Sequence, residues 1–155
     1  MAALIEAAFT GDIAKGTEFL ANGGDIEYQT DAMDYERMLF FGTTALIAAT
    51  VGKQHEFVKF LLDKGCKLDT KNAIGSALRA AVLSNSIDTV KLLLDKGSSV
   101  DIPDANGNTP IMAASLHNYV EVAKLLIDKK CNLNLKDNGT HSPVHIFSNQ
   151  FLYFS

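Results

Sequence analysis

A six-residue motif returns twice in this chain at nearly constant spacing, and this periodicity constrains the fold more than any other feature. The motif Phe-Leu-Leu-Asp-Lys-Gly occupies residues 60–65 and recurs in similar form at residues 92–97 and 125–130. The two shifts are 32 and 33 residues. Internal similarity at this period indicates stacked copies of one small unit, each burying its apolar face against its neighbours. The sequence therefore predicts a solenoid with an extended surface for binding other molecules, and no crevice suited to catalysis.

Length, composition and charge narrow the possible classes of protein. A chain of 155 residues fits one domain of about four units, and 47% hydrophobic content is enough for their core. The sequence contains no run of 18 apolar residues, so no membrane-spanning helix is predicted. The N-terminus lacks the basic region of a signal peptide. The net charge of -4, with lysines spaced at the repeat period, argues against nucleic acid as a partner. We expect a cytoplasmic protein, with the nucleus as an alternative.

The two cysteines, Cys66 and Cys131, hold the same repeat position two units apart. Stacked helices are spaced so that these residues would lie roughly 20 Å apart, which is too far for a disulfide. We expect small buried thiols in a reducing compartment.

Helix signals in the third full unit fit a pair of helices. Thr109 suits an N-cap, where its hydroxyl can accept a bond from a free backbone N–H, and Pro110 suits the first turn. Paired alanines follow, and residues 119–129 then show apolar side chains at helical spacing. Each unit is therefore predicted to be a helix-turn-helix.

These residues resemble the ankyrin repeat, with its Thr-Pro-Leu-His opening, its paired leucines and its Gly-Ala-Asp-Val-Asn end. The resemblance covers essentially the whole chain and implies an all-α solenoid with short β-hairpin fingers. It divides the single domain 1–155 into an N-terminal capping repeat (1–27), a repeat opening with an inserted finger (28–41), three repeats (42–74, 75–106 and 107–139) and a partial C-terminal repeat (140–155).

Three departures from the repeat carry further expectations. The first unit is separated from the second by nine extra residues between Tyr28 and Phe41, an insertion rich in aromatic residues that either contacts a partner or covers the seam between two units. Lys130 replaces the glycine that follows the second helix, and a left-handed conformation there would cost on the order of 1 kcal/mol. The fifth unit stops after its first helix, and its aromatic end suggests a truncated array, a self-capping helix or an oligomer contact.

The resemblance also implies a binding surface, the concave face, formed by the fingers and the exposed side of the first helices. One position late in the first helix is apolar in four successive units and is Asn149 in the partial fifth unit, which predicts an apolar stripe along that face. The alternative is that these side chains belong to the core. The predicted partner-binding residues from the stripe and the inserted finger are Phe9, Tyr35, Phe40, Phe41, Val51, Leu83, Leu116 and His117.

No arrangement in the sequence favours an enzyme. The four histidines are scattered, and His141 and His145 lack the glutamate of a zincin motif between them. We expect no cofactor and no metal.

The leading hypothesis is a protein-interaction module that acts as an adaptor, scaffold or stoichiometric regulator. The alternatives are a targeting fragment of a larger multidomain protein and a self-associating structural protein. We expect a monomer, with self-association through the aromatic C-terminus as the alternative.

Overall fold

The computed structural model describes residues 2–31 and 40–146 of the chain. Helices and two short strands follow one another in a regular order, and a further helical turn covers residues 143–146. The elements are α1 (Ala2–Thr10), α2 (Ile13–Ala21), α3 (Ala45–Val51), α4 (His55–Asp63), β1 (Lys71–Asn72), β2 (Gly75–Ser76), α5 (Ala77–Leu83), α6 (Ile87–Asp95), α7 (Pro110–Leu116) and α8 (Val120–Asp128).

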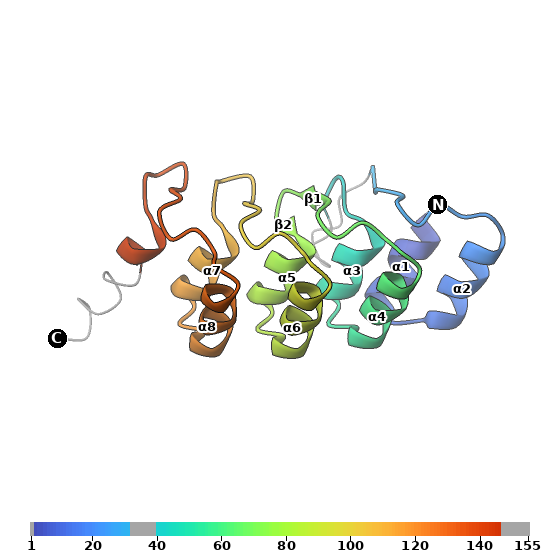
Figure 1. Cartoon of the computed structure of the whole chain (residues 1–155). Helices are drawn as coiled ribbons and strands as arrows, with labels where there is room; N and C mark the ends of the chain where they lie inside the picture. The colour runs from blue at the N-terminus through green and yellow to red at the C-terminus, as the bar shows by residue number, and fades with distance from the viewer. Residues whose placement is uncertain (1, 32–39, 147–155) are drawn as a thin grey trace.

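The helices form two rows, as Figure 1 shows. The first helices of the units, α1, α3, α5 and α7, pack on one another in sequence order, and α4, α6 and α8 do the same in the second row. Each first helix also packs on its own second helix. The loops between units project from one edge of the stack (Figure 1). This arrangement confirms the predicted all-α solenoid.

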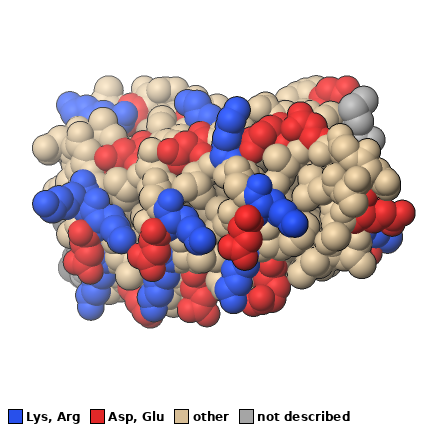
Figure 2. Space-filling model, turned by 45° about the vertical axis from the view of Figure 1, so that its right-hand side comes forward, with Lys and Arg blue, Asp and Glu red and all other residues tan. Residues whose placement is uncertain are grey.

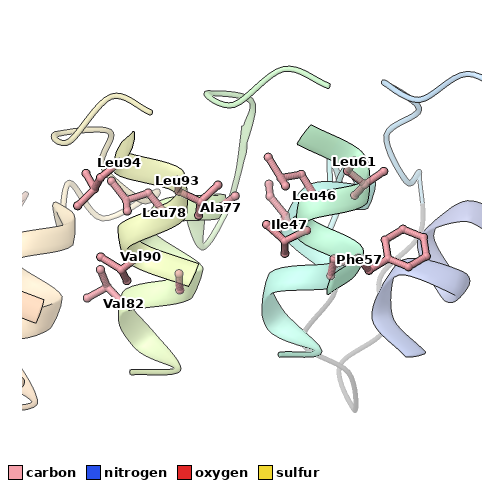
Figure 3. Packing of buried hydrophobic residues seen from close by; sticks show 14 of the residues in the cluster. Leu46, Ile47, Phe57, Leu61, Ala77, Leu78, Val82, Val90, Leu93 and Leu94 are labelled. Atoms are coloured by element: carbon pink, nitrogen blue, oxygen red, sulfur yellow. The ribbon is translucent and has the colours of Figure 1, made fainter. Parts of the chain in front are cut away.

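The hydrophobic core is continuous and lies between the two rows. In the second unit, Ile47 of α3 and Phe57 and Leu61 of α4 are at most 1% exposed. In the third unit, Leu78 and Leu93 are fully buried at the positions equivalent to Leu46 and Leu61 (Figure 3). Each unit packs its core side chains only within its own helix pair and against the neighbouring units, so the core lengthens with each unit that is added.

Short polar residues begin the first helices. The Thr44 hydroxyl accepts a hydrogen bond from the backbone N–H of Ile47 at 3.3 Å, and Ser76 caps α5 in the same way. Thr109 occupies the N-cap of α7 as predicted. Its hydroxyl oxygen, however, is buried and has no hydrogen-bond partner within the described chain. The backbone N–H of Thr109 donates to the sulfur of Met112 at 3.4 Å, the contact that a capping box makes from its third helical residue.

The turn after each second helix requires a left-handed residue. Gly65 and Gly97 have φ angles of 78° and 92° there, and Lys130 has a φ angle of 61°. Lys130 therefore adopts the left-handed conformation that the sequence analysis expected to be costly for a residue other than glycine. A lysine pays a steric cost in this region that glycine avoids.

Candidate protein-interaction surface

The projecting loops, or fingers, are hydrogen-bonded to one another in a row. The side-chain amide of Asn72 donates to the hydroxyl of Thr43 in the preceding finger at 2.7 Å. One finger further on, the backbone N–H of Ala105 donates to the carbonyl oxygen of Ala73 at 3.1 Å. The next junction repeats this between Asn138 and Asn106 at 2.9 Å. The first link joins two side chains and the other two join backbones, so the row forms one continuous ridge.

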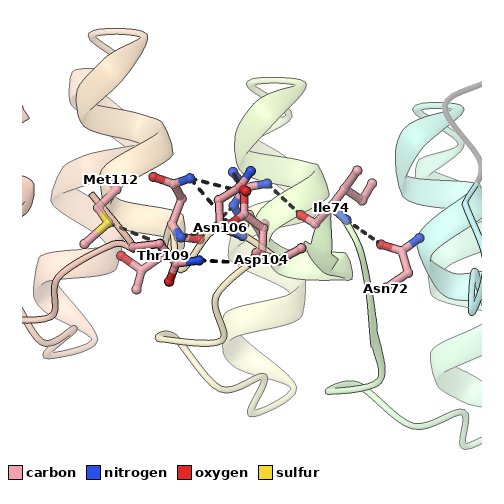
Figure 4. Close-up of polar contacts among 10 residues, drawn as sticks. Asn72, Ile74, Asp104, Asn106, Thr109 and Met112 are labelled. Carbon is pink, nitrogen blue, oxygen red and sulfur yellow. Dashed lines mark hydrogen bonds and ion pairs between the residues drawn. The ribbon is translucent and has the colours of Figure 1, made fainter. Parts of the chain in front are cut away.

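A buried ion pair holds the third finger on the third unit (Figure 4). A guanidinium nitrogen of Arg79 lies 2.7 Å from a carboxylate oxygen of Asp104, and the two side chains are only 9% and 8% exposed. Arg79 also donates to the carbonyl oxygens of Ile74 at 2.6 Å and Asn108 at 3.0 Å. Burial lowers the pKa of Arg79, and the charge of Asp104 opposes that shift. Every donor of this arginine that points inward therefore meets an acceptor.

Sequence analysis overlooked this pair, although a signal was present. Arg79 stands where the ankyrin motif has its histidine, so the departure from the motif could have prompted a search for an acidic partner in the next finger. At the matching position of the fifth unit, the Ser142 hydroxyl and a ring nitrogen of His145 lie 2.8 Å apart.

The inserted finger is anchored at both of its ends. The backbone N–H of Thr30 donates to the carbonyl oxygen of Thr43 at 3.0 Å, and the N–H of Gly42 donates to the carbonyl oxygen of Thr30 at 2.8 Å. Phe40 is half-buried, whereas Phe41 is 59% exposed. The insertion therefore places one aromatic side chain in solvent beside the finger row. The predicted site residue Tyr35 lies outside the described residues.

The side chains of the predicted apolar stripe differ in exposure. Three of them are half-buried and pack against the core: Phe9, Val51 and Leu83. Leu116, in contrast, is 59% exposed. The neighbouring His117 is exposed, and its ring stacks on Tyr119 with centroids 5.3 Å apart. A further described helix pair follows the unit of each half-buried residue of the stripe, and no such pair follows the unit of Leu116. The stripe is therefore most exposed at its C-terminal end.

The thiols show no sign of chemical activation. Both cysteines are free; Cys131 is buried, while Cys66 is only half-buried, less than predicted. Burial raises the pKa of Cys66 to about 12, and nearby Glu27 adds to this shift. A thiol with such a pKa is protonated at neutral pH and is a poor nucleophile.

The described residues include no group of three or more His, Cys, Asp and Glu side chains placed to hold a metal ion. None of their helices is both long and apolar enough to cross a bilayer.

Comparison with known proteins agrees with the architecture. A family model described as ankyrin repeats (3 copies) matches residues 4–104 and 74–137. A search of curated proteins found no match.

Proposed function

Because the chain belongs to the ankyrin repeat family, we propose that it binds another protein through its fingers and its concave face, as an adaptor, scaffold or stoichiometric regulator. Ankyrin repeats are in general non-catalytic modules for protein-protein interaction. The proposed role needs no cofactor and no nucleic acid. Two free cysteines favour a reducing compartment, so we place this activity in the cytoplasm.

The exposure of Phe41 is the observation that carries the proposal. The Phe41 side chain is 59% exposed, so it presents apolar aromatic surface that a partner would remove from water on binding. Phe41 lies at the end of an insertion that the other units lack. The backbone beside it is held by the hydrogen bond from the N–H of Thr43 to the carbonyl oxygen of Phe40. A rigidly held aromatic residue loses little conformational entropy on binding, which is why such residues dominate many interfaces.

Affinity capture from the native cell lysate tests this function. The intact protein and a Phe41→Ser variant are compared, and the captured proteins are identified by mass spectrometry. We expect one specific partner to be lost or reduced at least about tenfold, in line with the loss of an interface anchor worth about 2 kcal/mol. The melting temperature should change by no more than a few degrees, because the Phe41 side chain contributes little to the core.

An Ile13→Ser variant serves as the matched control. Ile13 is also an exposed apolar residue, at 39%, but it lies at the start of α2 and away from the inserted finger. It should capture the same partner as the intact protein. Equal capture by all three proteins would remove the inserted finger from the binding site.

A further inference from the structure

Exposed apolar side chains gather at the C-terminal end of the fourth unit. Val120 is 52% exposed, Ile127 is 47% exposed and Leu133 is 37% exposed. We call these three residues, together with Lys124, Asp128 and Asn134 beside them, the end face. Apolar residues gathered on one surface are characteristic of a site that another molecule covers.

The repeat register shows how such a face is covered elsewhere in the same molecule. Leu94 of α6 is equivalent to Ile127 of α8, and it is only 6% exposed. Ile87 and Val100, equivalent to Val120 and Leu133, are half-buried. The difference arises because α8 packs on α6, whereas no described helix packs on the far side of α8. The covered form of this surface is therefore the α6 face with α8 on it.

Two ion pairs accompany the apolar contact between α6 and α8. Lys91 lies 3.8 Å from the carboxylate of Glu121, and Asp95 lies 3.1 Å from the ammonium group of Lys129. The second pair has an equivalent one unit earlier, between Asp63 and Lys96. Figure 2 shows the resulting repeated pairs of basic and acidic side chains. Since the earlier residue of α6 pairs with the earlier residue of α8, the two helices run in the same direction.

A third contact joins the turns that follow the second helices. The Asp101 carboxylate accepts a hydrogen bond from the backbone N–H of Asn132 at 3.0 Å. Asp69 accepts one from Ser99 in the same way at 2.9 Å. The third unit thus offers its successor a lysine, an aspartate and a polar turn residue, whereas Lys59 of the second unit pairs within its own helix.

On the end face the residues offered are Lys124, Asp128 and Asn134. Lys124 and Asp128 form no ion pair in the part of the chain that the structure describes. The face therefore combines uncovered apolar side chains with one positive and one negative group a single helical turn apart. A helix that packs here in the same direction as α8 packs on α6 matches both charges when it carries an acid toward its N-terminal end and a base toward its C-terminal end.

We propose that the end face binds an amphipathic helix from another protein, running in the same direction as α8. By analogy with Glu121 and Lys129, this helix carries an acidic and a basic residue eight positions apart. Between them it presents apolar side chains, as α8 does with the fully buried Val122 and Leu126. The nine residues after Ile146 contain no acidic or basic side chain, so they do not supply this charge pattern. This site is separate from the inserted finger and does not depend on the proposed function.

The test uses a helix that is known to fit an equivalent surface. A hydrocarbon-stapled peptide with the sequence of residues 118–130 is titrated into the full chain, and binding is followed by fluorescence anisotropy and by methyl NMR. Saturable binding that shifts the methyl signals of Val120, Ile127 and Leu133 is expected. Reversing both charges of the protein, Lys124→Glu with Asp128→Lys, should weaken binding at least about fivefold, because two attractions become repulsions.

A charge-swapped peptide provides the decisive comparison. With Glu121→Lys and Lys129→Glu, it should bind the intact protein poorly and regain affinity for the reversed protein. The matched control is Lys15→Glu with Glu18→Lys, an exposed pair of α2 at the other end of the stack, which should leave peptide binding unchanged.

Several outcomes would overturn the proposal. One is the absence of saturable binding at about millimolar peptide, because a dissociation constant above this concentration is far weaker than that of specific interfaces. Another is an unchanged peptide affinity after the charge reversal. A several-fold gain in affinity after Phe147→Ser with Phe151→Ser would identify the chain's own C-terminal residues as the occupant. A dimer in sedimentation analysis that dissociates on Lys124→Glu would identify a second copy of this chain.

Discussion

At the scale of single residues, Lys130 shows how the repeat tolerates a conformational cost. The turn after the second helix places this residue at a φ angle of 61°, where glycine stands in the two preceding units. The cost arises within the backbone and its own Cβ, so it is independent of any partner. Compared with the third unit, which has Gly97 in this turn, the fourth unit therefore carries an additional backbone cost at Lys130.

Lys130→Gly should raise the free energy of unfolding by up to about 1 kcal/mol, because glycine reaches positive φ without steric cost. Urea denaturation followed by circular dichroism measures the change. The reciprocal control is Gly97→Lys, where a Cβ would meet no atom within 4 Å and only the backbone cost remains. It should lower stability by a similar amount. Equal stability of all variants would show that this turn relaxes to avoid the strain.

At the scale of helices, the stack depends on small residues where neighbouring elements approach closely. Gly16 of α2 is buried against the ring of Phe57 in α4, and a Cβ there would lie 2.6 Å from the ring. Gly52, the C-cap of α3, faces the backbone carbonyl of Phe9 in α1. Carbonyl oxygens cannot move aside as a flexible side chain can, so the second position is the more restrictive one.

Gly52→Ala should destabilise the protein by about 1–3 kcal/mol, the usual cost of overpacking. The new methyl group would overlap the carbonyl oxygen of Phe9 and force α1 and α3 apart. Ser84 holds the same position in the third unit, and Ser84→Ala is expected to change stability by about 0.5 kcal/mol or less. Thermal unfolding of the two variants gives the comparison. A gain in stability for Gly52→Ala would mean that helix propensity outweighs the contact between these helices.

At the scale of the whole molecule, the two ends of the stack are chemically different. The N-terminal unit exposes the charged side chains of Glu6, Lys15 and Glu18. The end face of the fourth unit is instead apolar at Val120 and Ile127. The two end surfaces therefore differ in polarity.

Hydrogen exchange should reveal a gradient of stability along the stack. Stability in a solenoid comes from each unit and its immediate neighbours, so units with two neighbours unfold less often than terminal ones. We expect the slowest amide exchange in α5 and the fastest among the described helices in the turn at residues 143–146. Mass spectrometry of peptic fragments measures this. Uniform protection throughout would indicate one cooperative unit.

The sequence by itself determined the architecture and much of its local chemistry. The period predicted the stacked helix pairs, and the missing glycine at Lys130 predicted a costly turn, because these depend on residues near one another in the chain. The tertiary structure decided the rest. Only packing shows that Leu83 is half-buried while Leu116 is exposed, since burial depends on the unit that follows. Likewise, only the folded chain brings Arg79 to Asp104, because a buried ion pair forms between elements that the repeat pattern treats as independent.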